Sequence, residues 1–254
     1  MSGTIAVMLK GIIFDLGWTL IEREGEEAEV LARSKADLGD FLIGAGVPLE
    51  REAFGATFEA KLDEFHSQRL RDWVEVTTAF VLRETLAALS LLPLSDEVTA
   101  GAVKAFFSYS ESRWRPVPGA HATLADLAGA GYRLGLISNA GDTANVERLI
   151  DGADLRRWFD PILISAAVGF RKPNPRIFEM ALERMKVAAE EAAMVGDTLG
   201  ADILGAQLIG MRNVWLARRS DAPANEAHRG NIQPEITINA LEELAEALAV
   251  ISEQ

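Results

Sequence analysis

The sequence predicts an α/β protein whose core is a doubly wound parallel sheet, interrupted near its start by an all-helical insertion. Two observations carry this prediction. From residue 116 onward, short apolar runs alternate with segments of helical pattern, which is typical of a parallel sheet with crossover helices. Residues 22–114, by contrast, place apolar side chains almost only at helical spacing. We therefore expect a core of residues 8–21 and 115–254 and a helical cap of residues 22–114.

The first core strand is predicted at residues 12–14, an apolar run that stops at Asp15. Such a strand delivers a single carboxylate to the carboxyl end of a sheet, where open α/β sheets hold their ligands. The helical insertion follows this strand directly. Within it, Gly46, Pro48 and Pro93 interrupt the pattern and indicate about four helices.

Four later strands complete the predicted sheet, and polar helices such as residues 142–150 and 175–185 separate them. The four strands are expected at residues 132–137, 161–165, 193–195 and 213–216. After them, the segment 220–234 is rich in Asn, Ala, Pro and Gly, and we expect it to be the least ordered loop.

Composition narrows the classes of partner. The chain has 25 Lys and Arg against 38 Asp and Glu, a net charge of −13, which disfavours binding to nucleic acid or to an anionic membrane. It contains no cysteine, which excludes disulfides and thiolate metal sites and fits a reducing compartment. No apolar stretch approaches the roughly 20 residues of a membrane span. We expect a cytoplasmic protein; the sequence sets no expectation for its oligomeric state.

Functional side chains are predicted where the strands end. Asp15, Ser138 and Asp197 each follow a strand and Lys172 stands at the start of a helix, so a parallel sheet would bring them to one edge. Two carboxylates at one edge repel each other unless a cation lies between them, and oxygen ligands suit Mg²⁺. Lys172 and the Ser138 hydroxyl would meet the oxygens of a phosphoryl group. Attack by a carboxylate on phosphorus gives an aspartyl-phosphate, so phosphoryl transfer is the predicted reaction class.

Four segments of the chain resemble, in order, the motifs of the haloacid dehalogenase superfamily, with a helical (C1-type) cap after the first motif. They are Asp15 to Leu20, Leu136 to Asn139, Val168 to Phe178 and Gly196 to Asp202. The resemblance implies a Rossmann-like core and a hydrolase that uses Mg²⁺, most simply a phosphatase acting on a small phosphorylated metabolite.

The resemblance also implies roles for particular residues. Asp15 would be the nucleophile, and Lys172 would hold both it and the phosphoryl group. The expected substrate contacts are Ser138, Asn139 and Lys172. Trp18 stands where the family motif has a glycine; from the chemistry of its indole we expect a further substrate contact that excludes water and offers a stacking face, the alternative being that it packs under the cap. The expected metal site comprises Asp15, the backbone carbonyl of Gly17, Asp197 and Asp202, the last ordering the outer shell of the ion.

One position departs from the family pattern. The second aspartate of the first motif, the usual general acid, is replaced by Gly17. Loss of general acid catalysis costs about 10²- to 10⁴-fold in rate, so the resemblance implies a preference for leaving groups that need little protonation. Alternatively Glu22, Glu24, His66 or a water molecule takes over the acid role.

Three other functions remain open from the sequence. Dehalogenases of the superfamily also lack the second aspartate, but they use no metal, and the Asp197 and Asp202 pair favours Mg²⁺. Phosphonate-cleaving relatives require a cap lysine, for which Lys35, Lys61 and Lys104 are available without a distinctive context. A ligand-binding or interaction protein that has lost its chemistry is the third alternative.

Overall fold

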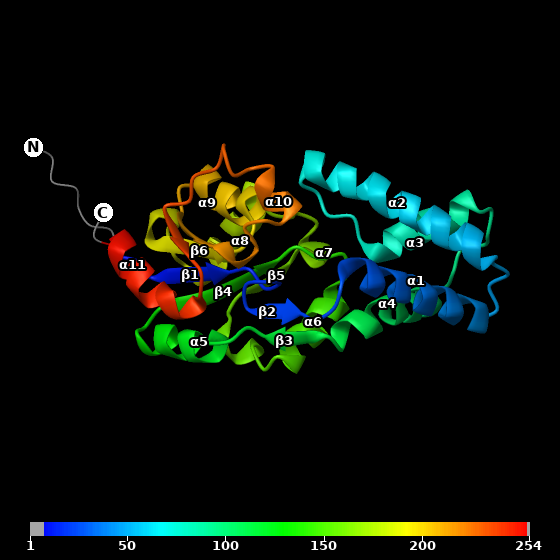
Figure 1. Ribbon diagram of the computed structural model, residues 1–254, viewed down its shortest axis with the longest axis horizontal. Helices are drawn as coiled ribbons and strands as arrows, with labels where there is room; N and C mark the ends of the chain where they lie inside the picture. The colour runs from blue at the N-terminus through cyan, green and yellow to red at the C-terminus, as the bar shows by residue number, and fades with distance from the viewer. Residues whose placement is uncertain (1–7, 253–254) are drawn as a thin grey trace, which may run out of the picture.

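A six-stranded parallel sheet forms the core of the chain, with the strand order β5-β4-β1-β6-β7-β8 (Figure 1). The structure is a computed structural model and describes residues 8–252, so the last two residues of the predicted core lie outside the described part. The strands are β1 (Gly11–Phe14), β4 (Arg133–Ser138), β5 (Ile162–Ile164), β6 (Ala192–Gly196), β7 (Arg212–Leu216) and β8 (Ile236–Ile238). The predicted doubly wound parallel sheet is confirmed.

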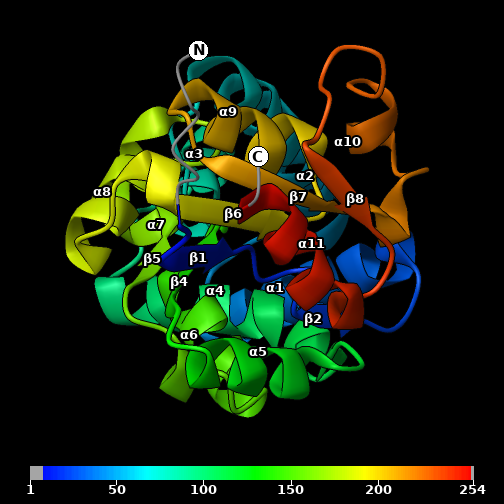
Figure 2. The same cartoon turned by 90° about the vertical axis from the view of Figure 1, so that its left-hand side faces the viewer.

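Helices cover both faces of this sheet, because its strands are apolar on both sides (Figure 2). Along β1, Ile12 and Phe14 point to one face and Ile13 to the other, and all three are fully buried. The first face is covered by α5 (Ala120–Gly129), α6 (Thr143–Gly152) and α11 (Leu244–Ser252). The second is covered by α8 (Pro175–Met185) and α9 (Leu204–Leu208), and the short helices α7 (Ser165–Val168) and α10 (Pro223–Glu226) lie in connecting segments.

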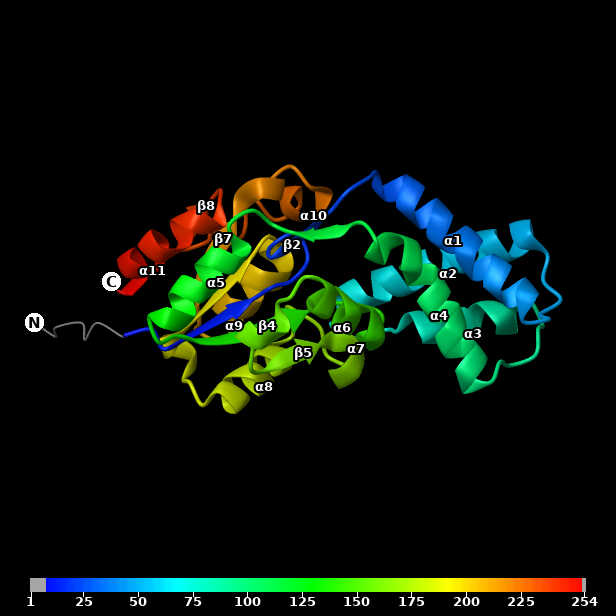
Figure 3. The same cartoon turned by 90° about the horizontal axis from the view of Figure 1, so that it is seen from below.

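The insertion folds into four helices with a hydrophobic core of their own, built around Leu42, Phe58, Leu82 and Phe106. They are α1 (Glu27–Gly44), α2 (Arg51–Asp72), α3 (Thr78–Ala88) and α4 (Asp96–Glu111). Side chains cap three of them: Glu50, Thr77 and Ser95 accept hydrogen bonds from backbone N–H groups of the first turn. The four helices lie together at one end of the molecule, and α11 lies at the other (Figures 1 and 3). We refer to residues 22–114 as the cap.

A two-stranded antiparallel ribbon joins the cap to the core. It pairs β2 (Ile21–Arg23) with β3 (Trp114–Pro116) and straddles both predicted boundaries. The sequence predicts neither this ribbon nor the edge strand β8, because each strand has only three residues and shows no periodicity. None of the described helices combines the length and apolarity needed to cross a membrane.

The segment 220–234 is also more structured than expected. It contains α10, and its Asn225 is almost completely buried. The Asn225 amide donates to the backbone carbonyls of Asp197 and Arg219, both at 2.9 Å, and its Oδ1 accepts from the Leu199 N–H at 2.8 Å. A loop of polar composition is therefore tied to the carboxyl edge of the sheet by the buried Asn225 amide, and its Ile232 packs against Leu199, Ile203 and Trp215.

Candidate active site

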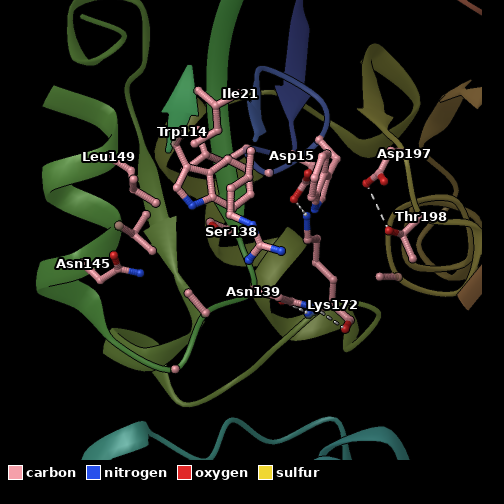
Figure 4. Close-up of a pocket in the computed structure, with 18 of the residues that line it drawn as sticks. Asp15, Ile21, Trp114, Ser138, Asn139, Asn145, Leu149, Lys172, Asp197 and Thr198 are labelled. Atoms are coloured by element: carbon pink, nitrogen blue, oxygen red, sulfur yellow. Dashed lines mark hydrogen bonds and ion pairs between the residues drawn. The ribbon is translucent and has the colours of Figure 1, made fainter. Parts of the chain in front are cut away.

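A cavity of about 420 Å³ lies between the carboxyl edge of the sheet and the cap (Figure 4). Asp15 stands at its centre because it follows β1, which lies between β4 and β6. The Asp15 N–H donates to the Val195 carbonyl at 2.9 Å, which fixes the backbone at this point. All the predicted site residues line this one cavity: Asp15, Gly17, Trp18, Ser138, Asn139, Lys172, Asp197 and Asp202.

Lys172 is buried and joins three elements of the site. Its ammonium lies 2.6 Å from Asp15 Oδ1 and 2.7 Å from Asp202 Oδ1, and donates to the Ile137 carbonyl at 2.8 Å. Burial acts to lower the pKa of Lys172, but the carboxylates of Asp15 and Asp202 outweigh it and raise that pKa above its ordinary value. Lys172 is therefore a fixed cation that orients the Asp15 carboxylate.

Asp15 also belongs to a cluster of three carboxylates. Single oxygens of Asp15, Asp197 and Asp202 lie within 4.8 Å of one another. Burial and the charges of Asp15 and Asp202 raise the pKa of Asp197 to about 8. Burial likewise raises the pKa of Asp202 to about 6, although Lys172 acts to lower it. Lys172 and Arg219, the latter 3.8 Å from Asp197 Oδ2, give this cluster two positive charges for three carboxylates. Hard oxygen donors in this arrangement fit a divalent cation such as Mg²⁺.

The backbone around Asp197 and Asp202 is held tightly. Asp202 lies on a short π-helical turn (Leu199–Ile203), and its Oδ2 accepts from the Thr198 N–H at 2.9 Å. A Cβ on Gly196 would come within 2.3 Å of the Asp202 carboxylate, so only glycine permits this approach. The Asp197 carbonyl accepts from Trp215 Nε1 at 2.9 Å as well as from Asn225. The sequence does not predict the supporting roles of Trp215 and Asn225, because neither residue belongs to a local motif.

Ser138 ends β4 and Asn139 follows it, but the two side chains have different partners. Ser138 is buried and faces the cavity. Asn139 uses both ends of its carboxamide on the backbone of Lys172: its Nδ2 donates to the Lys172 carbonyl at 2.9 Å, and its Oδ1 accepts from the Lys172 N–H at 2.8 Å. Asn139 therefore positions the lysine, and its expected contact with substrate stays a prediction.

Gly17 and Trp18 face a second tryptophan that the sequence analysis did not single out. A Cβ on Gly17 would meet the Trp114 ring at 3.6 Å, so a side chain there would project toward that indole. The rings of Trp18 and Trp114 lie 5.4 Å apart at 59°. The Arg219 guanidinium lies 4.1 Å from the centre of the Trp18 ring. Trp18 lines the cavity as expected, and the Arg219 guanidinium covers one of the two faces of its indole.

The candidate replacements for the missing acid lie elsewhere. Glu22 pairs with Arg218 at 2.6 Å, and Glu24 and His66 are exposed. None of these three lines the cavity, and among the described residues its lining includes no glutamate or histidine. The cap lysines considered for phosphonate chemistry are also absent from the lining, since Lys172 is the one lysine among its described residues.

The loop between α2 and α3 fastens the cap to the core close to Lys172. The Glu75 carboxylate is buried and accepts from Ser165 Oγ at 2.6 Å, and it lies 3.9 Å from Arg171 Nε. Val74 forms an isolated antiparallel bridge with Phe170. The loop that carries Lys172 is therefore supported by both the cap and the sheet.

This fold and this cluster of Asp, Ser, Lys and Asp side chains at the sheet edge define a hydrolase of the haloacid dehalogenase type. The family model for haloacid dehalogenase-like hydrolases matches residues 9–210, and the chain belongs to that family.

Relatives and solved structures carry differing activities in their names. The chain is 34% identical over 226 residues to a glyceraldehyde 3-phosphate phosphatase of Methanothermobacter thermautotrophicus, covering 89% of this chain and 92% of the relative. It is 38% identical over 183 residues to a phosphoserine phosphatase of Thermus thermophilus, covering 71% and 70% of the two chains. The crystal structure of a 2-haloacid dehalogenase from Pseudomonas syringae superposes with a TM-score of 0.67 at 30% identity, covering 96% and 99%.

Proposed function

We propose that this enzyme is a Mg²⁺-dependent phosphatase that hydrolyses a small phosphorylated metabolite through an aspartyl-phosphate at Asp15. The observation that carries the proposal is the pairing of Asp15 with Lys172, whose ammonium lies 2.6 Å from Asp15 Oδ1. Asp15 belongs at the same time to a cluster of three carboxylates with Asp197 and Asp202. The phosphatases among its relatives support the same activity. A cytoplasmic location stays a prediction.

In the proposed mechanism, the Asp15 carboxylate attacks phosphorus, an oxygen–phosphorus bond forms, and the bond to the departing alcohol oxygen breaks. Lys172 and the Ser138 hydroxyl stabilise the charge that develops on the transferring oxygens. A water molecule then attacks the same phosphorus and releases phosphate and the Asp15 carboxylate. Asp15, Asp197 and the Gly17 carbonyl would hold Mg²⁺, with Asp202 supporting its outer shell; when bound, the ion neutralises phosphate charge.

The structure offers no side-chain acid for the leaving oxygen among the described lining residues, apart from the carboxylates already assigned. We therefore propose that a water molecule protonates that oxygen, or that it departs as the anion.

The expected result is a steep dependence of rate on the pKa of the leaving group. Phenyl phosphate and p-nitrophenyl phosphate have the same shape near phosphorus, but the second has the better leaving group. Its kcat/KM should be higher by about 10²-fold or more, because general acid catalysis of that size would otherwise help the poorer leaving group depart. The measurement is kcat/KM across a series of substituted phenyl phosphates. A rate that does not vary with leaving-group pKa, while chemistry limits turnover, would show that an acid acts at this site after all.

Mg²⁺ should stabilise the folded enzyme, and more strongly as the pH rises from about 6 to about 8, the range set by the pKa values of Asp202 and Asp197. In that range the metal-free folded state binds protons that the unfolded chain has released, so its stability falls as the pH rises. Mg²⁺ competes with those protons, and its binding strengthens with pH. The measurement is the Tm shift caused by millimolar Mg²⁺ at each pH, with Asp197→Asn as control. An equal shift at every pH would contradict this assignment of the ion.

Phosphate release from a panel of phosphomonoesters, with Mg²⁺ and with EDTA, tests the proposed function itself. Turnover that requires Mg²⁺ is the expected result. A metal-free dehalogenase would have no need of three converging carboxylates, so Asp197 and Asp202 favour phosphorus over carbon as the atom attacked. If the enzyme released chloride from a 2-haloacid at a rate unchanged by EDTA, the proposal would be overturned. If neither substrate class were hydrolysed, a binding protein would be favoured.

A further inference from the structure

The proposed chemistry uses one side of the cavity. Figure 4 shows Asp197 and Thr198 on that side, and Asn145, Leu149 and Trp114 on the other. We call this second side the leaving-group end. Arg23, which also lines the cavity, belongs to it because its guanidinium lies 5.8 Å from the centre of the Trp114 ring. Because the phosphoryl group must lie against Asp15, the alcohol part of a substrate would extend into this end.

Arg23 is an incompletely paired cation at the leaving-group end. It ends β2, its side chain is only 10% exposed, and its Nε is buried with no hydrogen-bond partner in the described structure. The guanidinium lies 5.9 Å from the Trp18 ring centre and 5.8 Å from that of Trp114. Its ion pair is with Glu27, whose side chain is 78% exposed. That Nε is closed to solvent, so a ligand in the cavity would meet the outer guanidinium nitrogens, of which only Nη2 is bonded within the described structure, to Glu27. The guanidinium can therefore still pair with an anionic acceptor on a ligand.

Asn145 provides a second donor. This residue lies in the first turn of α6, is 8% exposed, and lines the cavity. Its Oδ1 is closed to solvent, whereas its Nδ2 is open and donates to none of the described residues. A ligand that fits this end therefore needs an anionic acceptor for Arg23 and a further acceptor oxygen for the Asn145 amide.

The arrangement of the aromatic rings argues against a flat aromatic ligand. Arg219 covers one face of Trp18, and Trp114 is tilted against that ring by 59°. The two indoles therefore hold guanidinium groups in place and restrict their motion. They also exclude water from Arg23, which strengthens its attraction for an anion.

We propose that the leaving-group end is a carboxylate subsite, in which Arg23 binds a carboxylate on the alcohol part of the substrate and Asn145 Nδ2 donates to the same carboxylate or to a neighbouring hydroxyl oxygen. A carboxylate suits this end better than a second phosphate because one guanidinium, already shared with Glu27, faces it. The substrate class is thus a small phosphorylated hydroxy acid or amino acid. This inference rests on the proposed function, and such substituents also lower the pKa of the departing oxygen, which suits a site without an acid.

The test compares O-phosphoserine with O-phosphoethanolamine, which differ only in the carboxylate. The wild-type enzyme should prefer O-phosphoserine in kcat/KM by about 10- to 100-fold, the value of a hydrogen bond to a charged group. Arg23→Met should bring this ratio close to one, and Arg23→Lys should restore part of it. Asn145→Leu, which removes the second donor, should lower kcat/KM for O-phosphoserine more than for O-phosphoethanolamine and so reduce the ratio. Arg33→Met, the same change on an arginine with an exposed side chain in α1, is the matched control for the arginine variants and should leave the ratio unchanged.

Several outcomes would overturn the subsite. A wild-type ratio near one would do so without any variant, and so would Arg23→Met protein that keeps the wild-type ratio; circular dichroism establishes whether each variant is folded. If p-nitrophenyl phosphate and both esters are all left intact in Mg²⁺, the proposed function fails instead. Titration calorimetry of the two esters then decides whether Arg23 still distinguishes them: equal affinities would overturn the subsite as well.

Discussion

Asp15→Asn should reduce phosphate release by about 10⁴- to 10⁶-fold, the loss typical of removing a nucleophile from an intact site. An amide is a very poor nucleophile toward phosphorus, yet it is nearly the same size as the carboxylate. The chain should still fold, because Asp15 is held by the Val195 carbonyl through its backbone. Steady-state kinetics on p-nitrophenyl phosphate with Mg²⁺ give the measurement.

Asp126→Asn is the matched control, since Asp126 is an exposed aspartate on α5 far from the cavity. It should leave the rate within experimental error of the wild type. Activity of Asp15→Asn protein within tenfold of wild type, after contaminating phosphatase has been removed, would show that another group attacks phosphorus.

Lys172→Met should impair both activity and folding. It removes the charge that meets the transferring oxygens, which should lower kcat by about 10²- to 10³-fold. It also leaves Asp15 and Asp202 facing each other in a buried site, and removing one partner of a buried ion pair costs about 3 to 5 kcal/mol. Urea unfolding in EDTA measures the free energy of unfolding, and Mg²⁺ should recover part of the loss by supplying positive charge.

Lys104→Met, an exposed lysine on α4, is the control for this change and should alter neither quantity appreciably. Lys172→Met protein with wild-type stability in EDTA would mean that the carboxylates take up protons at no net cost. Wild-type kcat in the same variant would remove Lys172 from the mechanism.

The position of the site could be predicted from the sequence because its functional residues lie at the ends of strands. Asp15, Ser138 and Asp197 each follow an apolar run, and a parallel sheet brings the carboxyl ends of its strands to one edge. The helical cap could be predicted for a similar reason: helical spacing persists over residues 22–114 with breaks at Gly46, Pro48 and Pro93. These are local patterns, which a single sequence displays directly.

The supporting residues could not be predicted, because they act through contacts between distant parts of the chain. Asn225 reaches the Asp197 carbonyl from a loop of polar composition, and Glu75 fastens the cap through Ser165. Trp114 meets Trp18 only because β3 pairs with β2 across the whole cap. Asn139 likewise has a role that no local pattern displays, since its carboxamide is bonded to the backbone of Lys172; its contact with substrate stays a prediction.

The most direct test of the account is to trap the covalent intermediate. The enzyme is mixed with substrate and Mg²⁺, quenched in acid within the first turnover, and reduced with borohydride, which converts an aspartyl-phosphate to homoserine. Mass spectrometry of the peptide that contains residue 15 should then find homoserine in place of Asp15. Phosphate released in full with Asp15 unreduced at every quench time, or homoserine at Asp197 or Asp202 instead, would contradict the assignment of Asp15 as the nucleophile.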